Sequence, residues 1–160
     1  MPNTIDTILI DAVNALQTLN ASIAGVTFAP QLSAYPTQLN TMQLPALLTW
    51  PSDGQLYVKG GAARASVRTF VVLGFVQPLT QNDIPTNAAA ALLLLQRCIN
   101  AYTNVSNIPL ANPSPTVPYQ LTIESGPDMQ HSDGGLVPDL SFGGAAFHGF
   151  RLRINVRALW

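Results

Sequence analysis

The chain has 160 residues; 48% are hydrophobic, only 9% are charged, and the net charge at neutral pH is −1. Average soluble proteins carry about 25% charged residues, so we expect either poor solubility alone or a surface that largely meets other proteins. The composition excludes intrinsic disorder, which goes with high charge and low hydrophobicity, and the charge balance excludes a global basic field that would recruit nucleic acid or an acidic membrane.

The first predicted element is an amphipathic helix. Apolar residues recur at helical spacing from Ile5 to Leu19 and form one apolar stripe. This segment has aspartates but no basic residue, so we expect no secretory signal here. The next residues, 20–41, contain Gly25, Pro30 and Pro36. They predict a long loop with a short extended piece at residues 26–29.

Three strands are predicted before the second helix. Met42–Trp50 predicts a strand, and Pro45 inside it favours an edge position or an irregular strand, because proline cannot donate to a ladder. A turn at Pro51–Gly54 and a short strand at Gln55–Lys59 follow. Ala65–Gln77 is almost continuously apolar, so we expect a strand that is covered on both faces.

The second predicted helix runs from about Asp83 to Thr103. Its centre, Ala88–Leu95, is apolar all round, which is typical of a helix buried on more than one side. One side would pack on the sheet of the same domain. The other side would meet a neighbouring subunit.

The C-terminal third predicts two further strands separated by loops. Residues 104–118 contain four prolines and predict an extended connector, and Tyr119–Glu124 alternates as a strand does. Residues 126–145 are rich in Gly, Pro and Asp and predict a long loop. In the last strand, Phe147–Trp160, apolar residues alternate strictly with polar ones.

This order predicts a single α+β domain. We expect a mostly antiparallel sheet with two main helices packed on one face, and long loops at about residues 20–41, 104–118 and 126–145. The length of the chain suits one domain with one core.

One cluster has residue types that catalysis or metal binding needs. His131, Ser132 and Asp133 lie near Asp128 and Asp139. The acidic spacing of a calcium loop is absent, and the two histidines of the chain are too few for a typical zinc site. We interpret the cluster as solvated loop residues.

Two other reactive residues have structural interpretations. Cys98 is the only cysteine and lies among apolar residues of the second helix, so we expect a packed, inert thiol. His148 lies on the apolar side of the last strand, where we expect a hydrogen-bonded, partly buried side chain. The sequence therefore predicts no catalytic residue, no cofactor and no metal.

Two groups of residues are candidates for assembly. Arg151, Arg153 and Arg157 share one face of the last strand. That row is either a solvated sheet face or a positive face toward an inner channel or a partner. The loop at residues 126–145 carries Met129, Leu136 and Phe142, and we predict that it is mobile in the free subunit and docks on another chain.

The layout resembles the tail terminator proteins of long-tailed bacteriophages. The features that carry the resemblance are the opening helix, the segment LPALLTWP at Leu44–Pro51, the strand RTFVVLGFV at Arg68–Val76, the helix Ala88–Asn104 and the closing segment AAFHGFRLRINVRALW at Ala145–Trp160. The match spans most of the chain and rests on order and spacing.

The resemblance implies a subunit of a homohexameric ring on the head-proximal end of the phage tail tube. Such a ring stops tube polymerisation and joins the tail to the head connector or stopper protein, without catalysis. The implied partners are other copies of the chain, the tail tube protein and the connector. DNA passing through the lumen is a further implied contact, and no membrane is involved. The implied location is the neck of the virion, after assembly in the host cytoplasm.

Two other hypotheses stay open. Residues 105–118 and 20–41 are longer than the minimal family pattern needs, which leaves room for another head–tail connector or tail-completion subunit. The third hypothesis is a small enzyme or ligand-binding domain that uses residues 126–145 as a lid.

Overall fold

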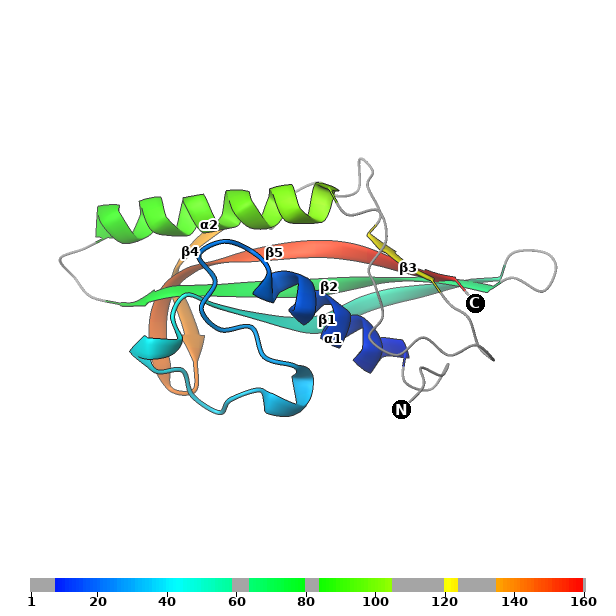
Figure 1. The fold of residues 1–160 in the computed structure, drawn as a ribbon, viewed down its shortest axis with the longest axis horizontal. Helices are drawn as coiled ribbons and strands as arrows, with labels where there is room; N and C mark the ends of the chain where they lie inside the picture. The colour runs from blue at the N-terminus through cyan, green and yellow to red at the C-terminus, as the bar shows by residue number, and fades with distance from the viewer. Residues whose placement is uncertain (1–7, 59–63, 80–83, 105–119, 124–134, 160) are drawn as a thin grey trace.

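A computed structural model describes residues 8–58, 64–79, 84–104, 120–123 and 135–159 (Figure 1). Its helices are α1 (Ile8–Ala21) and α2 (Ile84–Asn104), with two short 3-10 helices, η2 (Leu32–Ala34) and η3 (Thr41–Gln43). Its strands are β1 (Ala46–Val58), β2 (Arg64–Pro78), β3 (Gln120–Ile123), β4 (Gly135–Phe142) and β5 (Ala145–Leu159).

The described strands form one antiparallel sheet in the order β1-β2-β5-β3, and β4 also pairs with β5. β2 pairs with one edge of β5. β3 and β4 pair with opposite ends of the other edge, at Val156–Leu159 and Ala145–Arg151 respectively. Because β1 is an outer strand, the edge position that Pro45 predicted is confirmed.

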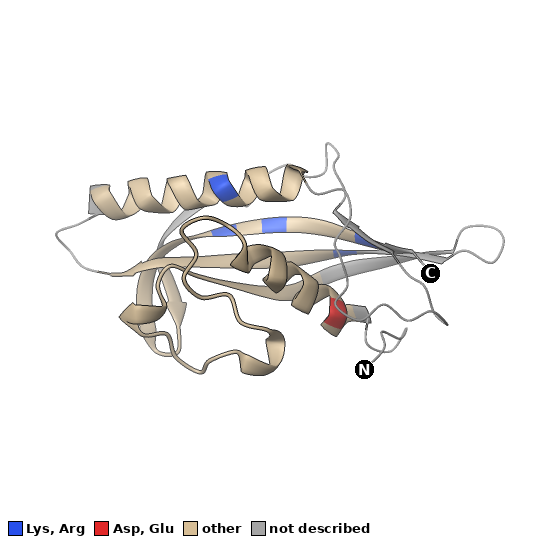
Figure 2. Ribbon diagram, in the orientation of Figure 1, with Lys and Arg blue, Asp and Glu red and all other residues tan. Residues whose placement is uncertain are grey.

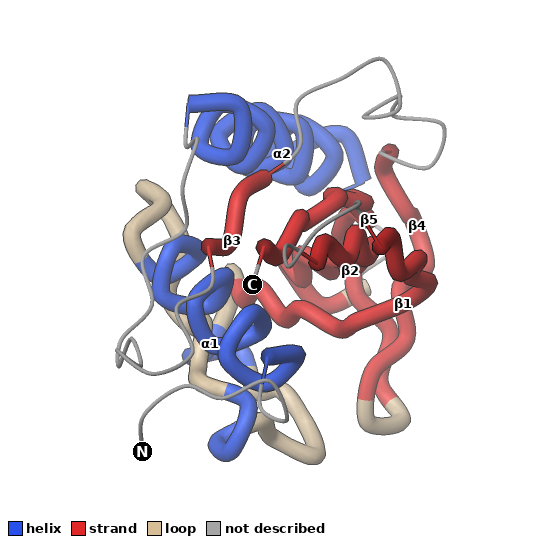
Figure 3. Tube along the Cα trace, turned by 90° about the vertical axis from the view of Figure 1, so that its right-hand side faces the viewer, coloured by secondary structure: helices blue, strands red, loops and turns tan. Residues whose placement is uncertain are grey.

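Both helices pack on the same face of the sheet (Figure 3). α1 contacts β1, while α2 contacts β5 and β2. Apolar side chains of both helices fill the space above the strands, with these among the largest buried members: Val13, Leu16, Leu94, Tyr102, Leu47, Phe70, Val72, Phe150 and Ile154. The predicted α+β fold, with two helices on one face of an antiparallel sheet, is confirmed.

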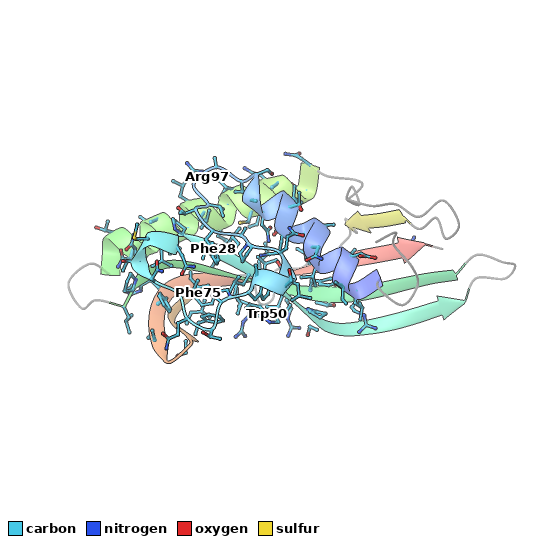
Figure 4. All side chains as sticks on the ribbon, turned by 60° about the horizontal axis from the view of Figure 1, so that its bottom comes forward. Phe28, Trp50, Phe75 and Arg97 are labelled. Carbon is cyan, nitrogen blue, oxygen red and sulfur yellow. The ribbon has the colours of Figure 1, made fainter. Side chains whose placement is uncertain are left out.

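A second apolar cluster lies around the start of β1 (Figure 4). Its buried members are Leu39, Leu44, Ala46, Leu48, Phe75, Leu140 and Phe147. Aromatic rings connect it: Phe75 contacts Phe147 at 5.6 Å between ring centroids and Phe142 at 5.3 Å. Trp50 contacts Phe142 at 6.2 Å and Tyr35 at 5.4 Å. The β4–β5 hairpin therefore packs against β1 and β2.

The outer edge of β1 is first covered by the chain that follows α1. Phe28 forms a parallel bridge with Ala46, which confirms the extended piece predicted at residues 26–29. The amides of Thr27 and Phe28 donate to the carbonyl of Pro45 at 2.9 and 3.3 Å, and the amide of Leu47 donates to the carbonyl of Phe28 at 2.9 Å. These bonds use backbone groups that an added strand would need.

Side chains cover the next outward-facing groups of the same edge. Nε2 of Gln17 donates to the carbonyl of Leu47 at 2.9 Å. The hydroxyl of Tyr35 donates to the carbonyl of Thr49 at 2.7 Å and accepts from the amide of Thr49 at 3.0 Å. Pro51 has no amide hydrogen to offer. From Pro45 to Pro51, the edge of β1 is thus sealed against strand addition.

Two sequence-based expectations about the first strands are corrected. The strand does not start at Met42, because Asn40 caps η3 with its side chain, which accepts from the amides of Met42 and Gln43. No turn separates two strands at Pro51–Gly54 either. β1 continues through this segment with a shift in register against β2, because a β-bulge absorbs residues that would otherwise suit a turn.

The long loop expected at residues 126–145 is also corrected, because β4 occupies Gly135–Phe142. A two-residue turn joins β4 to β5. Gly143 and Gly144 have φ angles of +59° and +82°, which is the left-handed backbone that a tight hairpin turn requires and that glycine adopts without strain. Interpreting these two residues as turn glycines is confirmed.

A close approach between β2 and β5 depends on another glycine. Gly74 lies opposite Phe150, and a Cβ atom at position 74 would lie 2.3 Å from the Phe150 ring. The ring fills the place of the missing side chain and is completely buried. This explains a glycine inside a central strand, where it otherwise weakens packing.

Candidate functional site

The arginine row lies on the face of β5 that points away from the helices. Phe150, Leu152, Ile154 and Val156 are buried on the helix side. Arg151 and Arg153 are exposed, and Arg157 is partly buried. The alternation predicted for this strand is confirmed, and it separates an apolar face from a cationic one.

Neighbouring strands add uncharged residues to the arginine row. In the sheet register, Arg153 lies opposite Val71, which in turn lies opposite Trp50. All three belong to one cross-strand row, where side chains share a face. Thr69 and Asn155 form another opposed pair, and Oγ1 of Thr69 donates to Oδ1 of Asn155 at 2.9 Å. Sequence reasoning missed these neighbours because they come from other strands.

The three residues predicted for an assembly loop have different places. Met129 lies outside the described residues. Leu136 is in β4, opposite Phe150 in the sheet register. Phe142 is partly buried against Phe75 and Trp50 of the same chain. Phe142 therefore belongs to β4 and to the second apolar cluster, so its placement in a loop is corrected, while docking on another chain stays a prediction.

The outer surface of α2 is apolar in its first half. Leu92 and Leu93 each keep 53% of their surface exposed, and Ala89 and Ala90 are exposed beside them. Ala91, Leu94, Leu95 and Cys98 face the sheet. The predicted burial of α2 on a second side stays a prediction, because Leu92 and Leu93 remain exposed and the described residues bury only the side that faces the sheet.

The second half of α2 presents polar groups instead. Nε2 of Gln96 donates to Oδ1 of Asn100 at 2.9 Å. Nη1 of Arg97 donates to the carbonyl of Ala24 at 3.0 Å and so ties α2 to the chain that follows α1 (Figure 4). The apolar patch of α2 is therefore confined to its N-terminal half, and we call residues 89, 90, 92 and 93 the α2 patch.

A buried polar network connects both helices to the sheet. Oε1 of Gln17 accepts from Nδ2 of Asn20 and from Oγ1 of Thr49, both at 2.8 Å. Nδ2 of Asn20 also donates to Oγ1 of Thr49 at 3.0 Å, and the hydroxyl of Tyr102 donates to Oδ1 of Asn20. All four side chains are essentially inaccessible to solvent. Because these buried side chains form hydrogen bonds with one another, we interpret the network as structural: it fixes the positions of α1 and α2 relative to β1.

Burial governs the protonation of the reactive side chains in this core. Burial raises the pKa of the Cys98 thiol to about 12, so the thiol stays protonated at neutral pH. Burial, reinforced by Cys98, also raises the pKa of Tyr102 well above its usual value, against the opposing effect of the Asn20 hydrogen bond. Neither group is poised to act as a nucleophile or base near neutral pH.

The residues weighed for catalysis do not form a described site. Residues 128 and 131–133 lie outside the described ranges, while Asp139 lies in β4. We expected His148 to be partly buried and hydrogen-bonded. The side chain is buried, but its Nε2 has no hydrogen-bond partner among the described residues. Within the described ranges, no three His, Cys, Asp or Glu side chains are grouped as a metal ion would need. None of the described helices is long and apolar enough to cross a membrane.

Comparison with known proteins adds no identification. No protein-family model matches the sequence, and no curated protein matches it.

Proposed function

We propose that this chain is a non-catalytic structural subunit of a homo-oligomeric ring, of the kind that tail terminators form on the head-proximal end of a phage tail tube. The observation that carries the proposal is the α2 patch. Consecutive leucines that are each 53% exposed are unusual on a chain with so few charges, and exposed apolar surface marks sites of protein contact.

The energetics favour covering the α2 patch in an assembly. Fully burying a leucine side chain stabilises by about 1.5–3 kcal/mol, so each half-exposed leucine offers roughly 1 kcal/mol. In a ring, the same contact would recur between each pair of neighbouring subunits, so its contributions to the stability of the ring would add up. The start of α1 adds Leu9 and Ile10, which are 37% and 50% exposed.

The proposal places the two chemically different surfaces on different sides of each subunit. The helices cover one face of the sheet, and the arginine row lies on the other. A ring with head-to-tail contacts needs unlike surfaces on each copy. This asymmetry supports a cyclic assembly of the kind that the sequence resemblance implies.

Electron microscopy tests the proposal directly. Tail tube protein polymerised with the purified chain should give tubes of limited length, with a ring at one end. The double substitution Leu92→Gln and Leu93→Gln should abolish the rings, because the apolar contact is lost. Gln96→Ala, on the exposed side of the same helix, serves as the matched control and should leave them intact.

Two outcomes would contradict the proposal. Tubes of unchanged length without any cap would exclude a terminator. Antibody labelling of whole particles gives an independent readout, and a label away from the head–tail junction would exclude a neck role altogether. A label at the junction without an effect on tube length would instead favour the connector hypothesis.

A further inference from the structure

The charges of this chain are segregated among its elements. Five of the seven Lys and Arg residues lie on β2 and β5, namely Arg64, Arg68, Arg151, Arg153 and Arg157. Two of the eight Asp and Glu residues lie on strands of the same sheet, Asp53 on β1 and Asp139 on β4, and none lies on β2, β3 or β5. In Figure 2 the blue positions accordingly follow β2 and β5, apart from Arg97 on α2. With five arginines and two aspartates on its strands, the sheet has a formal charge of +3 in a chain of net charge −1.

We propose that the arginine row of β5 binds the sugar–phosphate backbone of nucleic acid without reading its sequence. Arg151, Arg153 and Arg157 project from one face of one strand. Alternate residues of an antiparallel strand lie about 7 Å apart, so the row is roughly 20 Å long. One strand of a duplex carries about six phosphates over that length.

The neighbours of the row favour a linear polyanion over an acidic protein. An acidic protein would need carboxylates matched to the spacing of the arginines, whereas a nucleic acid strand offers phosphates along its whole length. The opposed pair Thr69 and Asn155 adds uncharged polar groups beside the row. Arginine forms bidentate hydrogen bonds with phosphate, and such contacts carry no sequence information.

The inference rests on the proposed function only for its biological setting. In a ring, copies of the row on adjacent subunits would act on one strand together, and linked contacts raise the effective affinity. Binding by the single chain needs no ring. With three arginines we expect the weak affinity of non-specific binding, a Kd of about 10⁻⁴–10⁻⁶ M.

Fluorescence anisotropy with a labelled oligothymidine tests the inference on the purified full chain. Three phosphate contacts on a single strand predict a slope of about −2 for log affinity against log salt. Raising the salt from about 50 to 200 mM should then weaken binding roughly 20-fold. Arg151→Gln or Arg153→Gln should weaken binding by about 3- to 10-fold and make the slope shallower by about 0.7 to 1.

The matched control is Arg97→Gln, which removes the same charge from α2 on the other side of the sheet. It should leave oligothymidine binding unchanged. Equal weakening by Arg97→Gln and Arg151→Gln would overturn the inference, because the effect would then be one of net charge. Failure of the wild-type chain to bind oligothymidine at 50 mM salt would also overturn it, and binding of polyglutamate instead would assign the row to an acidic protein.

Ring formation on tail tubes, followed with the same variants, separates the two proposals. Intact rings without oligothymidine binding would overturn this inference alone. Oligothymidine binding without rings would contradict the proposed function alone. Far-UV circular dichroism confirms that each variant is folded, as expected for substitutions at the exposed Arg151 and Arg153.

Discussion

The hydroxyl of Tyr102 shows how single atoms set the spacing between the layers of this fold. It reaches from α2 to Asn20 of α1, and Asn20 in turn contacts Thr49 of β1. Leaving one buried polar group unsatisfied costs about 1–3 kcal/mol, whereas removing both partners of a bond costs far less. The network therefore ties the relative positions of α1 and α2 to one set of hydrogen bonds.

A double-mutant cycle should reveal this coupling. Tyr102→Phe leaves Oδ1 of Asn20 without its donor, and we expect the free energy of unfolding to fall by about 1–2 kcal/mol. Asn20→Leu strands the Tyr102 hydroxyl and removes one of the two donors to Oε1 of Gln17, which keeps Thr49. A larger loss of about 2–4 kcal/mol is therefore expected. The double variant should lose at least 0.5 kcal/mol less than the sum. Urea unfolding measures all three values, and strict additivity would contradict the coupling.

Stability should decline in alkaline solution because of the same buried residues. The Cys98 thiol has a pKa of about 12 in the folded chain against an ordinary value of 9.0. Between these limits the unfolded chain loses the proton first, so the stabilisation present below pH 9 is lost progressively as pH rises towards 12. Each pH unit in this window is worth about 1.4 kcal/mol for one such group.

Cys98→Ala isolates the contribution of the thiol. The variant is expected to be less stable at pH 7, because it leaves a small cavity. Its urea midpoint should nevertheless fall less steeply than that of the wild type between pH 9 and 11. Burial also raises the pKa of Tyr102, so the variant should still lose some stability at alkaline pH. Parallel pH profiles for the two proteins would argue against a role of Cys98.

At the scale of the elements, the local sequence pattern predicted β2 and β5 well but did not predict β4. The alternation in β5 and the apolar run of β2 survive in the fold because each is a property of consecutive residues. β4 was missed because Pro138 and Asp139 interrupt its pattern. Its register against β5 shifts between Val137 and Leu140, and pairing with β5, which no local pattern records, defines this strand.

Likewise, only part of the candidate site could be predicted from the sequence. The arginine row follows from period-two alternation in one strand. The cross-strand neighbours Val71 and Trp50 follow only from the register of three strands. The covered position of Phe142 depends on a hairpin that folds against β1 and β2. Information of this kind is non-local, so a single sequence does not display it.

Gly74 gives a test of packing between two elements. Gly74→Ala would place a methyl group against the buried Phe150 ring, and overpacking of this kind typically costs about 1–3 kcal/mol. The second substitution Phe150→Leu removes the ring edge that a methyl group would meet. We expect Gly74→Ala to destabilise less in the Phe150→Leu background than in the wild type, as measured by urea unfolding. An equal cost in both backgrounds would exclude the ring as the cause.

At the scale of the whole molecule, the two sides of the sheet differ in their chemistry. The helix side ends in the apolar α2 patch, and the far side carries the arginine row. A free monomer usually keeps its exposed apolar patches small and mixes its charges. The separation seen here is consistent with a subunit whose surfaces are completed by different neighbours.

The sealed edge of β1 should control how the chain associates when it is not assembled. Tyr35→Phe removes the one hydroxyl that serves both the amide and the carbonyl of Thr49, so these groups become available to an added strand. We expect faster growth of thioflavin-positive aggregates at high protein concentration. Tyr35 also packs against Trp50, and phenylalanine keeps that contact. Tyr102→Phe, which removes a hydroxyl away from the edge, is the control and should not accelerate growth at matched stability.

The sealed edge would suit the proposed ring subunit. Such a subunit would be made before the tube end to which it binds, and it would have to avoid associating with its own copies through the backbone. Between Pro45 and Pro51 the chain closes that route with its own loop and side chains, and association there is left to side chains, which discriminate between correct and incorrect neighbours. The sealed edge therefore disfavours polymerisation through added strands.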